Sequence, residues 1–154
     1  MTVRMVTLRD ADAAPDRARI TEGVVARFRA KPFRWDRAAT CVHLARAQLA
    51  AFGHHVPPVP RFRSPLSAER ALRGLGFETL EALIDDALPG SRIAPARMVV
   101  GDIGMLPGRA PFNALVVAAG GGKFIGWSER APGGLRNLYD VSGNDFVAAW
   151  AVGR

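Results

Sequence analysis

Cysteine and histidine are both scarce in this chain of 154 residues. The single cysteine, Cys41, excludes an intramolecular disulfide and every zinc site that needs two thiolates. The three histidines are His43, His54 and His55, and the adjacent side chains of the last two should diverge rather than share a metal ion. We therefore expect no metal site.

Long apolar runs are also missing. No segment approaches the roughly 20 apolar residues that a membrane helix needs, and residues 1–17 lack the apolar region of a signal peptide. We expect a protein without a membrane span that is made and folded in a cytoplasm, with export inside a larger particle as the alternative. The length and an apolar content of 49% predict one domain with one hydrophobic core.

The positive charge is concentrated in the first half of the chain. Residues 1–80 carry 14 basic and 7 acidic side chains and so account for the net charge of +7, whereas residues 81–154 carry seven of each. A polyanion-binding patch is one interpretation. The other is an arginine-rich composition, since 19 of the 21 basic residues are arginine. We favour composition and do not expect nucleic acid as a partner, because no nucleic-acid motif or aromatic stacking platform accompanies the stretch formed by Arg17, Arg19, Arg27, Arg29, Lys31, Arg34 and Arg37.

Apolar residues in the first half recur at helical spacing. One helix should start near Pro15 and end before Pro32, and residues 1–14 would form an arm or an edge strand. Thr40 should cap a second helix that ends at Gly53, and the proline-rich residues 54–60 should be extended. Two shorter helices are predicted after caps at Ser67 and Thr79.

The second half has the pattern of strands. Continuous or alternating apolar runs occupy residues 97–100, 103–106, 114–118, 123–127 and 145–152. Gly120, Gly121 and Gly122 should form a hairpin turn, and a loose loop is expected around residues 132–134. Because helices precede strands, the fold class is predicted to be α+β with a mostly antiparallel sheet, in a single domain over residues 15–154.

Several apparent motifs do not meet the requirements of the chemistry they suggest. The run from Gly120 to Lys123 lacks the frame of a phosphate loop and has Phe124 where a Ser or Thr is needed. The pair Asp85 and Asp86 is expected to be solvated rather than catalytic. Because a dinucleotide fingerprint is missing as well, we expect no cofactor.

Cys41 has the most chemical promise. It stands in the first turn of a predicted helix, where the backbone amides and the macrodipole favour a thiolate. The aromatic loop that precedes it, with Phe33 and Trp35, could form one wall of a cleft.

The segment from Pro32 to Cys41, followed by a helix ending in Phe52-Gly53-His54, resembles the start of small phage-encoded proteins related in fold to NlpC-type cysteine peptidases. That start has the form P-F-x-W-G…D-C. The similarity covers about residues 17–152 and implies a papain-like fold. It continues through Phe62-Arg63-Ser64, the helix from Ala68 to Gly76, Gly101-Asp102 and the final segment from Ala149 to Val152.

The chain departs from this family pattern where catalysis would need it. Asp36 and Thr40 replace the Gly after the Trp and the Asp before the Cys, and Asn113 lies near the position of the family's histidine. His43 would point about 200° away from Cys41 around the helix, and His54 would lie roughly 20 Å further along it. We therefore interpret Cys41 as a small buried hydrophobe rather than as an active nucleophile.

The resemblance implies a non-enzymatic structural role in the tail tip or baseplate of a bacteriophage. The chain would be present in the host cytoplasm during assembly and then in the virion tail, with other tail proteins as partners. A bound peptidoglycan fragment stays open. The alternatives are a cysteine hydrolase with Cys41 as nucleophile and a polyanion-binding protein. The residues expected at a binding surface are Phe33, Trp35, Arg27, Arg29, Arg34 and Arg37.

Overall fold

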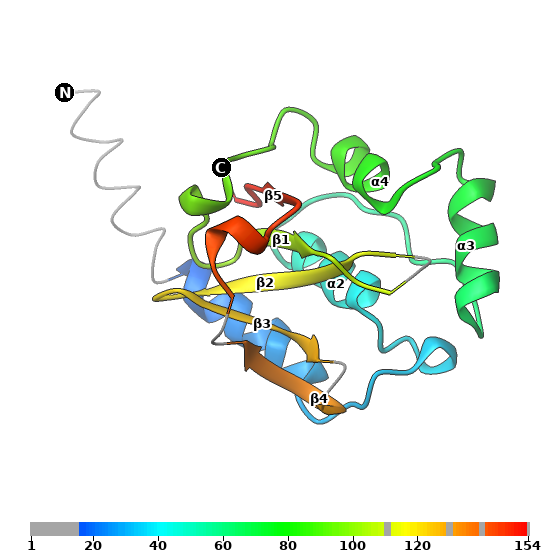
Figure 1. The fold of residues 1–154 in the computed structure, drawn as a ribbon, viewed down its shortest axis with the longest axis horizontal. Helices are drawn as coiled ribbons and strands as arrows, with labels where there is room; N and C mark the ends of the chain where they lie inside the picture. Colours follow the sequence, from blue (N-terminus) through cyan, green and yellow to red (C-terminus); the bar gives the residue numbers. More distant parts are fainter. Residues whose placement is uncertain (1–15, 110–111, 129–130, 139–140, 154) are drawn as a thin grey trace.

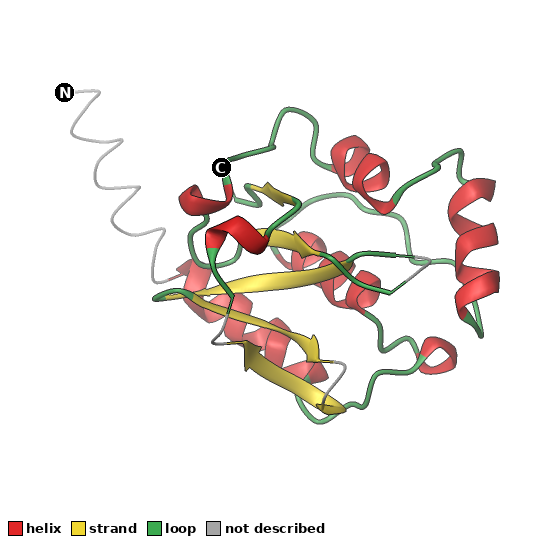
Figure 2. Cartoon of the chain, viewed as in Figure 1, coloured by secondary structure: helices red, strands yellow, loops and turns green. Residues whose placement is uncertain are grey.

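A computed structural model describes residues 16–109, 112–128, 131–138 and 141–153. In this part of the chain four α-helices precede a five-stranded antiparallel sheet, so the predicted α+β class is confirmed (Figures 1 and 2). The arm or strand predicted over residues 1–14 lies outside the described residues. Among the described helices, none is long and apolar enough to cross a membrane.

The helices begin and end largely at the residues that local chemistry selects. The N-terminal helix spans residues 16–28 and ends before Pro32. Helix α2 (Cys41–Ala51) follows the N-cap Thr40, and Gly53 follows it with a φ of 90°. Helices α3 (Pro65–Gly74) and α4 (Leu80–Ala87) complete the set, and the Thr79 hydroxyl caps α4 by accepting from the amide of Ala82.

All neighbouring strands of the sheet are antiparallel. The order is β4-β3-β2-β1-β5, and Gly120, Gly121 and Gly122 turn the chain from β2 to β3 with positive φ at each residue. Glycine suits these positions because a Cβ atom disfavours positive φ. The strands are β1 (Ile103–Leu106), β2 (Ala114–Gly120), β3 (Lys123–Ser128), β4 (Ala131–Leu138) and β5 (Ala148–Trp150).

Helix α2 lies behind the sheet and contributes to two clusters of buried side chains (Figure 1). Leu49 and Ala45 belong to the cluster with α4, β1, β2 and β5, whereas Leu44 belongs to the cluster with the N-terminal helix and β2 to β4. The helix therefore has apolar neighbours on two sides, which fixes its rotation and the direction in which its first residue, Cys41, points.

Two buried polar side chains connect elements that are distant in sequence. Gln48 of α2 donates to the hydroxyl of Thr21 and to the carbonyl of Gly101, each at 3.0 Å. Asp102, which is fully buried, pairs with Arg17 at 3.0 Å. Hydrogen bonding offsets the desolvation cost of the Asp102 carboxylate and of the Gln48 nitrogen, whereas Oε1 of Gln48 is buried without a partner among the described residues.

Four predictions about local structure were wrong. Ser64, not Ser67, is the N-cap of α3, while Ser67 completes a capping box. Residues 95–97 form a 3-10 helix, η2, and no strand covers residues 97–100. Residues 131–138 form strand β4 where a loose loop was predicted. The last strand covers only three of the predicted residues 145–152, and the 3-10 helix η3 (Gly143–Asp145) includes the first residue of that run.

Candidate functional site

A closed loop positions the aromatic residues that precede α2. Reciprocal backbone hydrogen bonds of 2.9 and 3.2 Å join Arg34 and Ala39 across the 3-10 helix η1 (Trp35–Arg37). Ala38 has a φ of 53°, an unusual conformation for a residue with a Cβ atom. The loop is thereby held in one shape, and it places Trp35 beside the start of α2.

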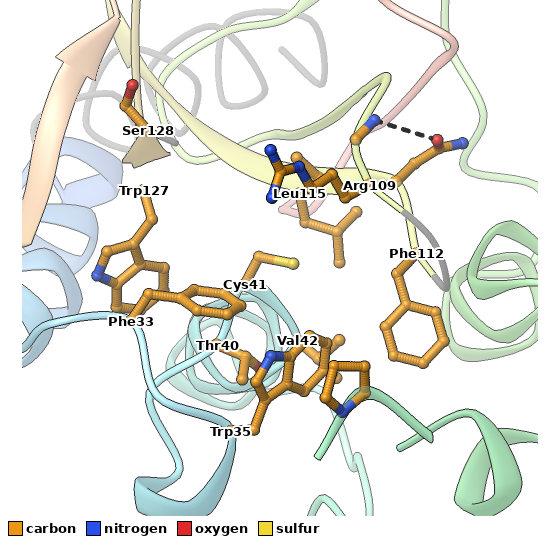
Figure 3. Close-up of a pocket in the computed structure, with 14 residues that line it drawn as sticks. Phe33, Trp35, Thr40, Cys41, Val42, Arg109, Phe112, Leu115, Trp127 and Ser128 are labelled. Carbon is orange, nitrogen blue, oxygen red and sulfur yellow. Dashed lines mark hydrogen bonds between the residues drawn. The ribbon is translucent and has the colours of Figure 1, made fainter. Parts of the chain in front are cut away.

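Cys41 is the first residue of α2 and is half-buried. The Thr40 hydroxyl accepts a long hydrogen bond of 3.5 Å from the amide of His43, which leaves Cys41 in the first turn as predicted. Figure 3 shows its sulfur directed into a pocket between α2, the η1 loop and the sheet. The sequence-based placement of the thiol at a helix start is therefore correct.

The pocket has a volume of about 420 Å³ and mostly apolar walls, to which four aromatic residues contribute. Phe33 contacts Trp35 and Trp127 edge to face, with ring centroids 5.4 and 5.7 Å apart. Phe112 lies 6.1 Å from Trp35 on the other side. Thr40, Val42, Pro65, Asn113 and Leu115 complete most of the lining, and Arg109 and Ser128 also line the pocket (Figure 3).

The apolar surroundings determine the protonation state of the thiol. Burial raises the pKa of Cys41, and hydrogen bonding with the backbone of Leu115 and of the first turn of α2 opposes this only in part. Burial penalises the charged form, so the helix start does not produce a stable thiolate here. At neutral pH the side chain is a protonated thiol.

Asn113 also lines the pocket, so the structure brings it together with Cys41. Its amide nitrogen donates to Glu81 at 3.4 Å and contacts the sulfur of Met105 at 3.7 Å, while its oxygen accepts from the amide of Gly108 at 3.4 Å. A carboxamide does not exchange a proton near neutral pH. Asn113 can therefore orient a ligand by hydrogen bonding, but it cannot act as the base or acid of a peptidase.

None of the three histidines of the chain lines this pocket. Nδ1 of His43 lies 2.8 Å from the Thr40 hydroxyl, and its ring packs against Phe62 at 5.4 Å, facing a different groove. Burial lowers the pKa of His43 and keeps it neutral. His54 is hydrogen-bonded to the carbonyl of Val152, and His55 is exposed. The arrangement therefore lacks an imidazole that could activate the thiol.

The arginines predicted to form a binding surface lie in different settings. Arg34 makes a bidentate pair with Asp36 at 3.0 Å, and Arg29 pairs with Glu22 at 3.4 Å. Arg27 and Arg37 line a second groove, which shares Trp35 with the Cys41 pocket. Asp85, predicted to be solvated rather than catalytic, has a side chain that is 44% exposed, and it also binds Arg92 and accepts from the indole of Trp150.

Sequence reasoning missed the pocket residues that the sheet contributes. Trp127 is the penultimate residue of β3, and its indole donates to the carbonyl of Lys31 at 2.9 Å. Phe112 precedes β2 by two residues. An aromatic residue at each of these strand ends was a visible signal, but only strand pairing shows that both ends meet the start of α2.

The model of one protein family, described as a domain of unknown function (DUF6950), matches residues 13–152. The chain belongs to this family. The match includes every helix and strand around the pocket, so the pocket is part of the family domain rather than an addition to it. No curated protein matches the sequence.

Proposed function

We propose that the chain is a non-enzymatic structural component of a bacteriophage tail tip or baseplate, in which a degenerate cysteine-peptidase fold acts as a protein-binding module. The supporting observation is the pocket beside Cys41, which has aromatic walls and no histidine. A concave apolar site of about 420 Å³ suits a large apolar side chain of a partner protein. The phage context rests on the resemblance of the segment from Pro32 to Cys41 to tail-associated proteins.

The chemistry of amide hydrolysis argues against turnover at this site. A cysteine peptidase needs a thiolate, a base that forms it and an acid that protonates the leaving amine. Burial raises the pKa of Cys41, and Asn113 cannot supply a proton. Glu81 binds Asn113 but does not line the pocket. The apolar walls that make the pocket a poor active site are the same feature that makes it a good binding site.

Two substitutions at one position separate binding from catalysis. Cys41→Ala removes the sulfur and leaves the pocket open, whereas Cys41→Leu fills part of it. We expect mass spectrometry of purified virions to find the parent chain and Cys41→Ala at similar levels, and Cys41→Leu at a reduced level. A thermal unfolding midpoint for Cys41→Leu close to that of the parent would confirm that the variant is folded.

Two results would overturn the proposal. One is a parent chain that stays free in the lysate and is missing from particles. The other is an equal loss of Cys41→Ala and Cys41→Leu from particles, because the sulfur rather than the pocket would then be required.

A cysteine hydrolase acting on peptidoglycan is the second candidate, and the direction of the Cys41 sulfur into an open pocket favours it. This function predicts rapid alkylation of Cys41 near neutral pH and release of soluble peptidoglycan fragments that stops in Cys41→Ala. Slow alkylation that becomes fast only in denaturant would exclude it.

A further inference from the structure

A second groove lies beside the Cys41 pocket, and the Trp35 side chain lines both. The groove has a volume of about 580 Å³. The N-terminal helix, η1, α2 and the extended segment through residues 58–62 form its walls. The pocket and the groove therefore adjoin at Trp35.

Five cationic side chains line the groove, and they come from separate parts of the fold. None of them has a carboxylate within 4.0 Å among the described residues. Asp36, the acidic residue in the lining, makes its bidentate pair with Arg34, which is not in the lining. The five cations are Arg27, Lys31, Arg37, Arg46 and Arg61.

The guanidinium of Arg46 has one hydrogen-bond donor without a partner in the described part of the chain. One of its terminal nitrogens donates to the carbonyl of Val56 at 3.2 Å. Its Nε–H is removed from solvent and has no acceptor among the described residues. Since a guanidinium forms its strongest hydrogen bonds with anionic oxygens, the groove has the chemistry of an anion site.

The aromatic residues of the groove decide between two kinds of polyanion. Single-stranded nucleic acid needs exposed ring faces on which bases stack. Here Phe28 is buried with the Lys31 ammonium 5.1 Å from its ring centroid, and Phe62 packs against both Trp35 and His43. These rings are occupied by neighbours, so the available interactions are charge pairs rather than base stacking.

We propose that this groove binds an acidic segment of a protein partner, with carboxylates paired to the cations and the adjacent pocket holding an apolar side chain of the same segment. The inference deepens the proposed function, because it names the chemistry of the protein partner. It does not depend on that partner being a tail protein. The prolines at positions 57, 58 and 60 lack amide protons, so strand addition along this wall is disfavoured and side-chain pairing should dominate.

The test compares two double variants with the same net charge. Arg37→Ser/Arg61→Ser removes two exposed cations from the groove, and Arg70→Ser/Arg97→Ser removes two exposed arginines that do not line it. Fluorescence anisotropy measures binding of a short labelled peptide of alternating Glu and Gly, and of a labelled oligo-dT of similar charge. We expect the groove variant to bind the peptide roughly tenfold more weakly and the control variant to match the parent.

Each other outcome overturns the inference. An equal loss in both variants would show attraction by net charge alone. Tighter binding of oligo-dT, weakened by the groove variant, would identify a nucleic-acid site, and no binding of either probe would remove the site altogether. The peptide assay tests the groove, whereas the virion experiment tests the role in the tail. Either experiment can fail while the other succeeds, so the two failures are distinguishable.

Discussion

The buried carboxylate of Asp102 offers a direct test of the fold that positions the site. Its two oxygens accept from Arg17, from the amide of Val152 and from the amide of Val99, each at 3.0 Å. Asp102→Asn keeps the size of the side chain but removes the charge. It also replaces one acceptor by an NH₂ group, which must then face a donor. The substitution therefore disturbs contacts to the N-terminal helix, to the chain before β1 and to the C-terminal segment together.

The cost follows from burial. The side chain of Asp102 is fully buried, and only 13% of the Arg17 side chain is exposed, so little solvent can replace the lost partner. Removing one partner of a buried ion pair costs about 3–5 kcal/mol. This is a large part of the roughly 5–15 kcal/mol by which such domains are stable.

Urea unfolding followed by tryptophan fluorescence measures the free energy of unfolding for this variant. Asp86→Asn is the matched control, because Asp86 is exposed, and it should change stability by less than about 0.5 kcal/mol. If Asp102→Asn lost less than about 1 kcal/mol, the argument that this carboxylate holds three segments together would be refuted.

Three further predictions concern the thiol, the edge of the sheet and acid stability. Because burial raises the pKa of Cys41, iodoacetamide should modify it more slowly in the folded protein than in urea across neutral pH, and a faster folded-state rate would contradict this. Gly134→Ala should lower the unfolding free energy by about 1–3 kcal/mol, because the new Cβ would lie 2.6 Å from the carbonyl oxygen of Arg29; an unchanged urea midpoint would refute that contact. Arg92 lowers the pKa of Asp85, so this carboxyl stabilises the fold above its unfolded-state pKa and loses that effect as the pH falls through the folded-state pKa. Asp85→Asn should therefore flatten the acid limb of the stability curve, and an unchanged limb would show that the pair contributes nothing.

The helices of the first half were predictable because their signals are local. A hydroxyl at Thr40 or Thr79 satisfies amides within three residues, and Gly53 ends α2 at the residue expected. The error at Ser67 has the same origin, since Ser64 and Ser67 both offer hydroxyls and the Pro at the first helical position decides for Ser64.

Strand β4 could not be predicted, since Pro132, Gly133 and Gly134 disfavour a strand in isolation. The strand forms because it pairs with β3 at the edge of the sheet and because the amide of Leu135 donates to the carbonyl of Arg29 at 3.1 Å. Strand β3 directly precedes β4 in the chain, but Arg29 is distant in sequence. A window of local sequence therefore lacks the contact with Arg29 that helps to stabilise this strand.

The sequence by itself determined the α+β order, the helix start at Cys41, the aromatic residues Phe33 and Trp35, and the lack of a histidine after residue 55. These follow from short-range hydrogen bonding, apolar periodicity and composition. Only the tertiary structure decided that Trp127 and Phe112 close the pocket, and that cations from several elements line one groove beside it. The physical reason is that strand pairing and helix packing build such a site from residues that are far apart in the sequence.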